Sequence, residues 1–306
     1  IGVRLVGSEM CIRDRFLHYR PDVLMLGNLE FDHADIFDSI ADVEKQFQYL
    51  LRSVPANGTV VVNADQPELG NLLARGCWSH VIRYSCTAAP AVWRAAALQA
   101  DCRRFDVYCE DHHVATVEWP LMGQHNLQNA IGAIAAAHVI GAKPEDACAA
   151  LAEFQAPKRR LERVNPNCSI ALFDDFAHHP TAVRETLAAM RSISQSGRVW
   201  ALFEPRSATS CRRLFQQEFS EALRLADCVV VTEVYRKNIL KADRLSELQL
   251  VSDLCSVGVE ATFAPTIDEV VSIVVESALP GDHVVAMSNG GFGNIHEKLV
   301  VALENR

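Results

Sequence analysis

The chain has 306 residues, 49% of them hydrophobic and 22% charged, which predicts an ordinary soluble globular protein of about two domains. Asp and Glu outnumber Lys and Arg by 38 to 29, and the net charge of -9, with no clustered basic patch, excludes a nucleic-acid partner. No apolar stretch approaches the roughly 20 residues that cross a bilayer, which excludes a membrane protein.

The ten cysteines are scattered along the chain without a C-x-x-C pair or a zinc-binding spacing. This pattern favours reduced thiols in a cytoplasmic protein over a disulfide framework. Residues 1–15 lack the apolar region and the cleavage site of a signal peptide, and they do not continue into the pattern that follows. We interpret them as a foreign leader.

The next part of the chain alternates strands with helices. Apolar runs of strand length occur at 22–26 and 59–63, and helical periodicity follows them at 39–54 and 67–74. Further runs of strand composition occur at 81–84, 91–98, 104–109 and 113–119. We expect these runs to form a small antiparallel patch, with a hairpin turn at residues 110–113.

Helical patterns at 126–140 and 144–154 complete a central domain, and the basic, Pro-containing segment 156–162 begins a second domain, 156–306. Five strand-length apolar runs occur in the second domain, at 168–173, 198–203, 228–232, 259–263 and 283–288. Helical patterns alternate with them, at 180–193, 209–225, 245–257, 266–278 and 293–304. This order predicts a doubly wound parallel sheet that binds ligands beyond the carboxyl ends of its strands.

Two polar loops that follow predicted strands are rich in titratable groups. Residues 28–35 contain three carboxylates and the imidazole of His33, enough negative charge to position Mg²⁺ beside phosphates, although a solvated acidic loop explains them equally well. Residues 174–180 place two acids before two histidines. That density favours a functional site over a routine turn.

Two further segments combine polar and small residues. Residues 123–129, Gly-Gln-His-Asn-Leu-Gln-Asn, open a helix, where His125 or Asn126 serves as a cap or the Asn amides pair with an adenine edge. Residues 288–294, Ser-Asn-Gly-Gly-Phe-Gly-Asn, end the last strand and let backbone N–H groups approach a phosphate. The glycines close a sheet instead of opening one, which disfavours a dinucleotide fingerprint.

Taken in order, six segments resemble the Mur ligase family: 28–37, 123–126, 159–162, 174–180, 203–207 and 287–294. The resemblance extends from about residue 16 to the end of the chain. It implies an α/β protein with a partial central ATP-binding domain, 16–155, and a C-terminal Rossmann-like ligase domain, 156–306.

The resemblance also implies an ATP- and Mg²⁺-dependent amide ligase of peptidoglycan recycling. ATP phosphorylates the carboxylate of UDP-N-acetylmuramate, and the amine of the murein tripeptide L-Ala-γ-D-Glu-meso-diaminopimelate attacks the resulting acyl phosphate. By position, the family's metal ligand corresponds to His33, and its nucleotide-binding groups to His125, Asn126, Asn129, Arg160 and Asp175. The groups that face the acyl phosphate and the amine correspond to His178 and Arg206. Without the resemblance, a helix contact explains His178 and a surface ion pair explains Arg206.

Some family features have no counterpart in this chain. It contains no Gly-Lys dipeptide and hence no G-x-x-G-K-[ST] phosphate loop, and it lacks a UDP-sugar domain and a metal carboxylate upstream of Asn28. We therefore expect an N-terminally truncated ligase that is inactive alone. The alternatives are a catalytically silent module that binds nucleotide and peptide, and the related ligase that adds alanine to the same sugar nucleotide. The alanine ligase is disfavoured because Pro205-Arg206-Ser207 lacks its usual His-Arg pair.

Overall fold

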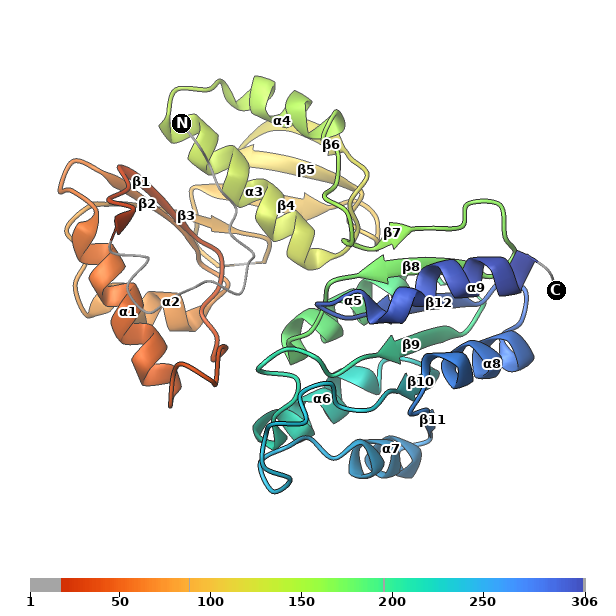
Figure 1. Ribbon diagram of the computed structural model, residues 1–306. Helices are drawn as coiled ribbons and strands as arrows, with labels where there is room; N and C mark the ends of the chain where they lie inside the picture. The colour runs from red at the N-terminus through yellow and green to blue at the C-terminus, as the bar shows by residue number, and fades with distance from the viewer. Residues whose placement is uncertain (1–17, 88, 195, 305–306) are drawn as a thin grey trace. The chain divides into compact units, whose positions relative to one another are not determined.

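The computed structural model describes residues 18–87, 89–194 and 196–304, so the predicted leader lies outside the described residues (Figure 1). The chain divides into two compact units. The first comprises residues up to Leu98 together with 104–119 and 127–153, and the second comprises 99–103, 120–126 and 154–306. Two short segments that precede the predicted boundary therefore group with the second unit.

The first unit is built on a six-stranded sheet whose strands lie in chain order. They are β1 (Val23–Leu26), β2 (Thr59–Asn63), β3 (His80–Ser85), β4 (Trp93–Ala97), β5 (Arg104–Cys109) and β6 (His112–Glu118). Neighbours from β1 to β4 pair in parallel, and β4, β5 and β6 pair antiparallel. The expected antiparallel patch, with its hairpin turn at 110–113, is confirmed for β4, β5 and β6. The run at 81–84 does not belong to it, because β3 pairs in parallel with β2 and β4, and the helix between β2 and β3 supplies the crossover that this parallel pairing requires.

Four helices accompany this sheet: α1 (Ile40–Ser53), α2 (Pro67–Ala74), α3 (Gln124–Val139) and α4 (Pro144–Ala152). Leu51 of α1 and Leu72 of α2 share one apolar cluster with Val60 of β2. Helix α3 packs closely against β1 and β3, because a Cβ on Gly132 would lie 2.3 Å from Met25 Cε and 2.9 Å from Tyr84 Cζ. Across the described residues, no helix is both long and apolar enough to cross a membrane.

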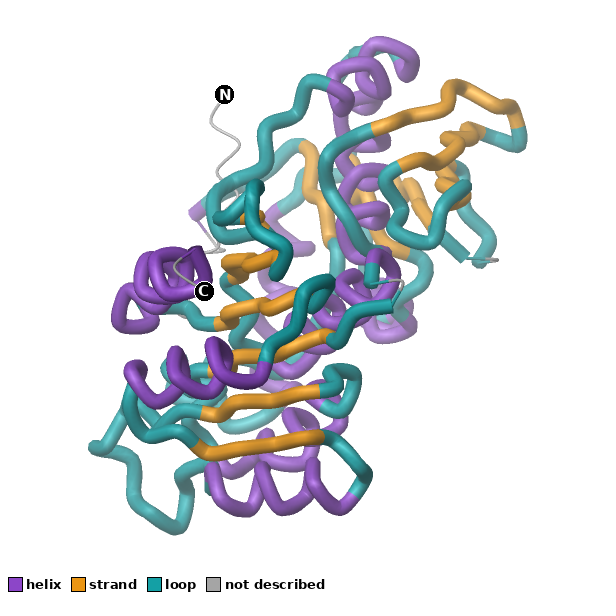
Figure 2. The backbone as a smooth tube through the Cα atoms, turned by 90° about the vertical axis from the view of Figure 1, so that its right-hand side faces the viewer, coloured by secondary structure: helices purple, strands orange, loops and turns teal. Residues whose placement is uncertain are grey.

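The second unit contains the predicted doubly wound sheet (Figures 1 and 2). Its strands are β7 (Glu162–Arg163), β8 (Ala171–Asp175), β9 (Val199–Phe203), β10 (Cys228–Val231), β11 (Glu260–Phe263) and β12 (His283–Met287). They lie in the order β11-β10-β9-β12-β8-β7, all parallel except the short edge strand β7. The last strand, β12, therefore lies between β8 and β9, where the chain reverses its direction of winding.

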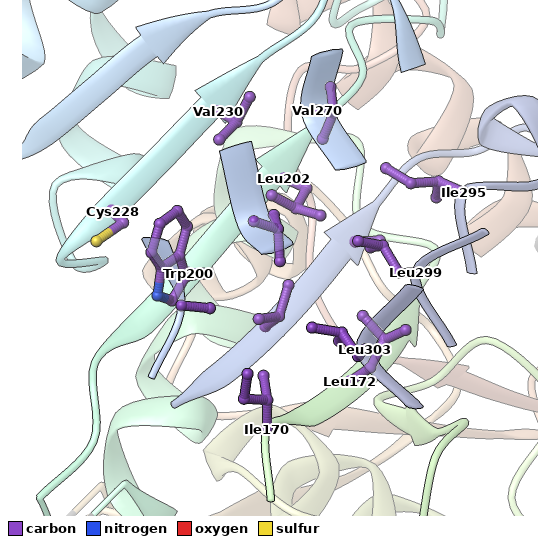
Figure 3. Close-up of a cluster of buried hydrophobic side chains, with 14 of the residues drawn as sticks. Ile170, Leu172, Trp200, Leu202, Cys228, Val230, Val270, Ile295, Leu299 and Leu303 are labelled. Carbon is purple, nitrogen blue, oxygen red and sulfur yellow. The ribbon is translucent and has the colours of Figure 1, made fainter. Parts of the chain in front are cut away.

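Helices cover both faces of this sheet, and they are α5 (Pro180–Ile193), α6 (Gln216–Leu223), α7 (Glu247–Ser256), α8 (Ile267–Ser277) and α9 (Ile295–Glu304). Trp200 and Leu202 of β9 belong to a buried cluster with α8 and α9 (Figure 3). Phe203, the next residue, contacts Phe219 of α6 with 4.9 Å between ring centroids. Because side chains alternate along a strand, α6 lies on the face opposite to α8 and α9.

Strand β8 begins later than the sequence indicates. A strand was predicted at 168–173, but the Asn165 side chain accepts a hydrogen bond from Leu172 N (2.7 Å) and donates one to Ile170 O (2.9 Å). These bonds hold residues 165–170 in a turn, so Asp174 and Asp175 are the last strand residues instead of loop residues.

The helix predicted at 209–225 also begins late, with a 3₁₀ turn at Arg213–Phe215 followed by α6. The Ser210 hydroxyl accepts hydrogen bonds from the backbone N–H groups of Arg206 (3.0 Å) and Ser207 (2.9 Å). This local bonding competes with helix formation, and it fixes the segment after β9 as a turn.

Candidate functional site

Three strands of the second unit, β8, β12 and β9, end side by side and carry polar residues at their carboxyl ends. Strand β8 ends in Asp174 and Asp175, while Glu204 follows β9 and Ser288 follows β12. The Ser288 hydroxyl donates a hydrogen bond of 2.5 Å to Glu204, and Ser288 N donates one of 3.2 Å to Asp175 O. This edge is where ligands bind in open α/β sheets.

Asp174 lies between two basic side chains. Arg159 Nε donates to its Oδ1 across 3.3 Å, and His296 Nε2 of α9 lies 3.2 Å from the same oxygen. Burial raises the pKa of Asp174, but His296 and Arg159 outweigh burial and hold that pKa below its ordinary value. Arg159 also donates to Ser288 O, so it ties the start of the second unit to the strand-end site. The sequence analysis did not select Arg159, Asp174 or His296 as site residues.

Asp175, predicted to bind nucleotide, is almost fully buried and accepts three hydrogen bonds from the protein. The donors are Leu161 N at 2.8 Å, Ala177 N at 2.8 Å and the Thr186 hydroxyl at 3.1 Å. Burial raises the pKa of Asp175 above its ordinary value, although these bonds and the charge of Arg160 oppose the rise. Asp175 thus anchors the turn at 159–161 to the end of β8.

His125 lies in the part of α3 that belongs to the second unit. Its Nδ1 atom is buried, and none of the described residues forms a hydrogen bond with it. Burial lowers the pKa of His125 from 6.5 to about 4, and the positive charge of Arg160 contributes, so the imidazole is neutral at pH 7. A buried polar atom without a partner costs free energy that a bound ligand with a hydrogen-bonding group would recover.

The prediction that His125 or Asn126 caps α3 is wrong, because the helix begins at Gln124 and both residues lie within its first turn. Asn126 Nδ2 donates to the backbone carbonyl of Met122 across 2.7 Å, so one of its amide hydrogens is used by the chain itself. Asn129 lies one turn further along α3, in the first unit, and is exposed.

His178 lies in the loop between β8 and α5. Its Nδ1 donates to the carbonyl oxygen of Phe176 across 2.8 Å, which places the lone pair of the neutral ring on Nε2. The helix contact that was the alternative explanation for His178 belongs to His179 instead, because His179 is the N-cap of α5 and accepts from Thr181 N at 3.4 Å.

Arg206 follows β9, and its guanidinium stacks on an aromatic ring. Its Cζ lies 3.8 Å from the ring centroid of Tyr235, and its Nη1 lies 3.8 Å from Glu204 Oε1. The guanidinium also adjoins Gly290, where a Cβ would lie 2.0 Å from Arg206 Nε. A surface ion pair does not describe Arg206, because the Glu204 side chain is only 9% exposed.

The predicted metal ligand, His33, belongs to the first unit and has a positive φ of 55°. Its backbone N donates to Asp32 Oδ1 across 2.7 Å, and its Nε2 lies 3.9 Å from Asp32 Oδ2. Within the described ranges, no three His, Cys, Asp or Glu side chains gather as a metal site. Mg²⁺ is usually held by one or two protein groups together with substrate phosphates and waters, so the assignment of His33 as a metal ligand stays a prediction.

Comparison with protein-family models places both units in one family. The Mur ligase middle domain matches residues 6–137, and the Mur ligase glutamate ligase domain matches residues 159–290. UDP-N-acetylmuramate--L-alanyl-gamma-D-glutamyl-meso-2,6-diaminoheptandioate ligase of Haemophilus influenzae is 39% identical over 95% of this chain, and that of Escherichia coli is 37% identical over 96%. The chain spans 62% of the length of each of these relatives.

Solved structures show the same relationship. The murein peptide ligase of Psychrobacter arcticus is 34% identical, with a TM-score of 0.69, over 95% of this chain and 59% of its own. The UDP-N-acetylmuramate-alanine ligase of Thermotoga maritima has a TM-score of 0.74 over 96% of this chain and 62% of its own. Its identity is only 21%, so it supports the fold alone.

Proposed function

The chain belongs to the Mur ligase family, of which it contains the middle and glutamate ligase domains, and from this premise we propose its reaction. The proposed reaction is the ATP-dependent joining of UDP-N-acetylmuramate to L-alanyl-γ-D-glutamyl-meso-diaminopimelate. The observation that supports it best is the strand-end edge of the second unit, where Ser288 and Glu204 join the loops that carry Gly290 and Arg206. The two relatives at 39% and 37% identity carry this activity in their names.

The proposed chemistry has two steps. A carboxylate oxygen of UDP-N-acetylmuramate attacks the γ-phosphorus of ATP, and ADP leaves. The peptide amine then attacks the carbonyl carbon of the acyl phosphate; a C–N bond forms, the C–O bond to phosphate breaks, and the amine loses a proton. Negative charge accumulates throughout, so the main task of the protein is to position charge and hydrogen-bond donors.

We assign nucleotide binding to the groups around the first turn of α3 and the 159–161 turn. The unpartnered Nδ1 of His125 suits a polar ligand group, and Arg160 supplies positive charge near it. Asn126 and Asn129 are proposed to read adenine, and Asp175 to hold the turn that carries Arg160. His33 is proposed to contribute to holding the Mg²⁺ that would accompany ATP and neutralise charge on its phosphates, while the steps of the reaction are assigned to this chain's own residues.

We assign to His178 and Arg206 the role of facing the acyl phosphate and the incoming amino substrate. The tautomer of His178 places a lone pair on Nε2, which is the atom suited to accept a hydrogen bond or proton from the attacking amine. The planar guanidinium of Arg206 suits a carboxylate of the peptide, because its fork forms two parallel hydrogen bonds.

The related alanine ligase is the second candidate, because such an enzyme from Caldicellulosiruptor bescii is 30% identical over 95% of this chain. The two candidate ligases differ in the amino substrate that they accept. The third candidate function is a module that binds nucleotide and peptide without catalysing a reaction.

The test measures ADP release by the gene product that carries this sequence. We expect release only when UDP-N-acetylmuramate and the tripeptide are both present. Faster release with free alanine than with tripeptide would overturn the assignment in favour of the alanine ligase, and binding without release would support the silent module. Arg206→Ala should abolish release with tripeptide, whereas the matched variant of the exposed Arg224, the residue that follows α6, Arg224→Ala, should retain it.

A further inference from the structure

The stacking of Arg206 on Tyr235 leaves the hydrogen-bond donors of the guanidinium unused. A guanidinium carries five N–H donors in its plane. In the part of the chain that the structure describes, no atom accepts a hydrogen bond from the Arg206 side chain, and the nearest carboxylate oxygen, of Glu204, is 3.8 Å away. The guanidinium lies over the Tyr235 ring, with Cζ 3.8 Å from the ring centroid.

The position of Tyr235 is fixed by backbone contacts between two strand-end segments. Tyr235 N donates to Pro205 O across 2.9 Å, and Thr232 N donates to Phe203 O across 3.0 Å. The Arg236 side chain donates through Nε to the carbonyl oxygen of Arg206 itself, at 3.2 Å. The Thr232 hydroxyl also donates to Phe203 O, at 3.4 Å. These hydrogen bonds bind the segment after β10 to the end of β9 and the segment after it, and none of them uses the Tyr235 ring.

Gly290 restricts the same guanidinium from the segment after β12. A Cβ at this position would lie within 2.4 Å of Arg206 Nε, Cδ and Cζ, so only glycine leaves room for the side chain as it stands. Ring contact and steric restriction together limit the rotamers of a long side chain that otherwise loses considerable entropy on binding. The arginine is thus held in one orientation before any ligand arrives.

We propose that Tyr235 is a positioning residue for the amino substrate: its ring holds the Arg206 guanidinium flat, so that the fork of N–H donors is preorganised for a carboxylate of the peptide. This inference rests on the proposed function. The ligand class follows from the donor set, because a planar fork with unused in-plane donors matches the two oxygens of a carboxylate. A preorganised fork improves affinity by reducing the ordering that binding requires.

The test compares Tyr235→Leu with Tyr235→Phe. Leucine removes the aromatic face, whereas phenylalanine retains it and removes only the hydroxyl. Calorimetric titration with the tripeptide should show that the dissociation constant rises about fivefold for Tyr235→Leu and changes less than about twofold for Tyr235→Phe. The dissociation constant for ADP should be the same for all three proteins, because the ring contacts Arg206 and not the residues assigned to nucleotide.

An NMR measurement reports the contact without any ligand. The Nε–Hε resonance of Arg206, assigned by its disappearance in Arg206→Lys, should carry a ring-current shift that Tyr235→Phe retains and Tyr235→Leu abolishes. Gly290→Ala, which displaces the guanidinium, should reduce the same shift.

Each other outcome counts against the inference. Equal peptide affinity in Tyr235→Leu and the unmodified protein would overturn the role of Tyr235 while leaving the proposed function intact. Equal losses in the Leu and Phe variants would assign the effect to the hydroxyl, and a parallel loss of ADP affinity would indicate a general disturbance of the edge; either result overturns the positioning role. Failure of the unmodified protein to bind the tripeptide would overturn both the inference and the proposed function.

Discussion

The Ser288 hydroxyl donates a 2.5 Å hydrogen bond to the buried Glu204 carboxylate, and this contact joins the segment after β12 to the segment after β9. The same hydroxyl oxygen accepts a hydrogen bond from Gly290 N at 2.9 Å. Through its other carboxylate oxygen, Glu204 lies 3.8 Å from Arg206. One serine therefore connects the carboxylate, the glycine and the arginine of the candidate site.

Replacing this serine should destabilise the second unit. Ser288→Ala removes the hydroxyl donor from a buried carboxylate, so the free energy of unfolding should fall by about 1–3 kcal/mol. Urea denaturation measures the loss. The control is Ser272→Ala on α8, where an exposed hydroxyl bonds to the Asp268 carbonyl of its own helix; this change should stay within about 0.5 kcal/mol. Equal losses in the two variants would contradict the role given to Ser288.

His125 should make the stability depend on pH below neutrality. Its pKa falls from 6.5 to about 4 on folding, so the unfolded chain binds the proton more readily between these values. The contribution of His125 to the free energy of unfolding is therefore at its maximum above pH 6.5. It is lost as the pH falls toward 4, by up to about 3 kcal/mol. The non-titrating variant His125→Gln should lack this part of the loss, which denaturant unfolding at a series of pH values measures. Matching pH profiles for the two proteins would refute the buried, neutral imidazole.

The fold was largely predictable because local sequence patterns indicate most of its helices and strands. The strand at 59–63 and the helices at 67–74 and 180–193 are confirmed to the residue, since β-branched runs and Pro at the first helical turn mark their bounds. The late start of β8 was not predictable, because the Asn165 side chain reaches Ile170 and Leu172 only after the turn has formed. Secondary-structure propensities contain no information about hydrogen bonds from a side chain to a distant backbone group.

The candidate site was predictable only in part. Asp174 lies at the end of β8 and Glu204 directly after β9, both in segments that the sequence analysis had already selected, so position at a strand end was the available signal. His296 and Tyr235 lie in α9 and after β10, and only the folded sheet brings them to Asp174 and Arg206. The role of His33 as a metal ligand stays a prediction, because a metal held by one or two protein groups and by substrate phosphates need not show a cluster of ligands in the chain alone.

A glycine far from the site should tolerate no side chain. Gly197 precedes β9, and a Cβ there would lie 1.9 Å from Gly281 O, a backbone atom that cannot rotate away. Gly197→Ala should therefore lower the free energy of unfolding of the second unit by about 1–3 kcal/mol or more. Gly291→Ala is the matched control, because nothing lies within 4 Å of its Cβ and its φ is -75°. A difference of less than about 0.5 kcal/mol between the two variants would show that the backbone relaxes freely.

Substitutions of Asn126 and Asn129 should distinguish a role in stability from a role in nucleotide binding. The Asn126 amide donates to Met122 O across 2.7 Å, so Asn126→Ala should lower the free energy of unfolding by about 1 kcal/mol whether or not adenine is bound. Asn129 is exposed, and none of the described residues hydrogen-bonds to its side chain, so Asn129→Ala should leave stability within about 0.5 kcal/mol. If its amide reads adenine, the same change should weaken ATP binding by about 1–3 kcal/mol, because a polar group of the ligand loses its partner. Calorimetric titration of the folded variant with ATP, beside thermal unfolding of the same sample, gives both quantities. An unchanged ATP dissociation constant in Asn129→Ala would remove this residue from the nucleotide site.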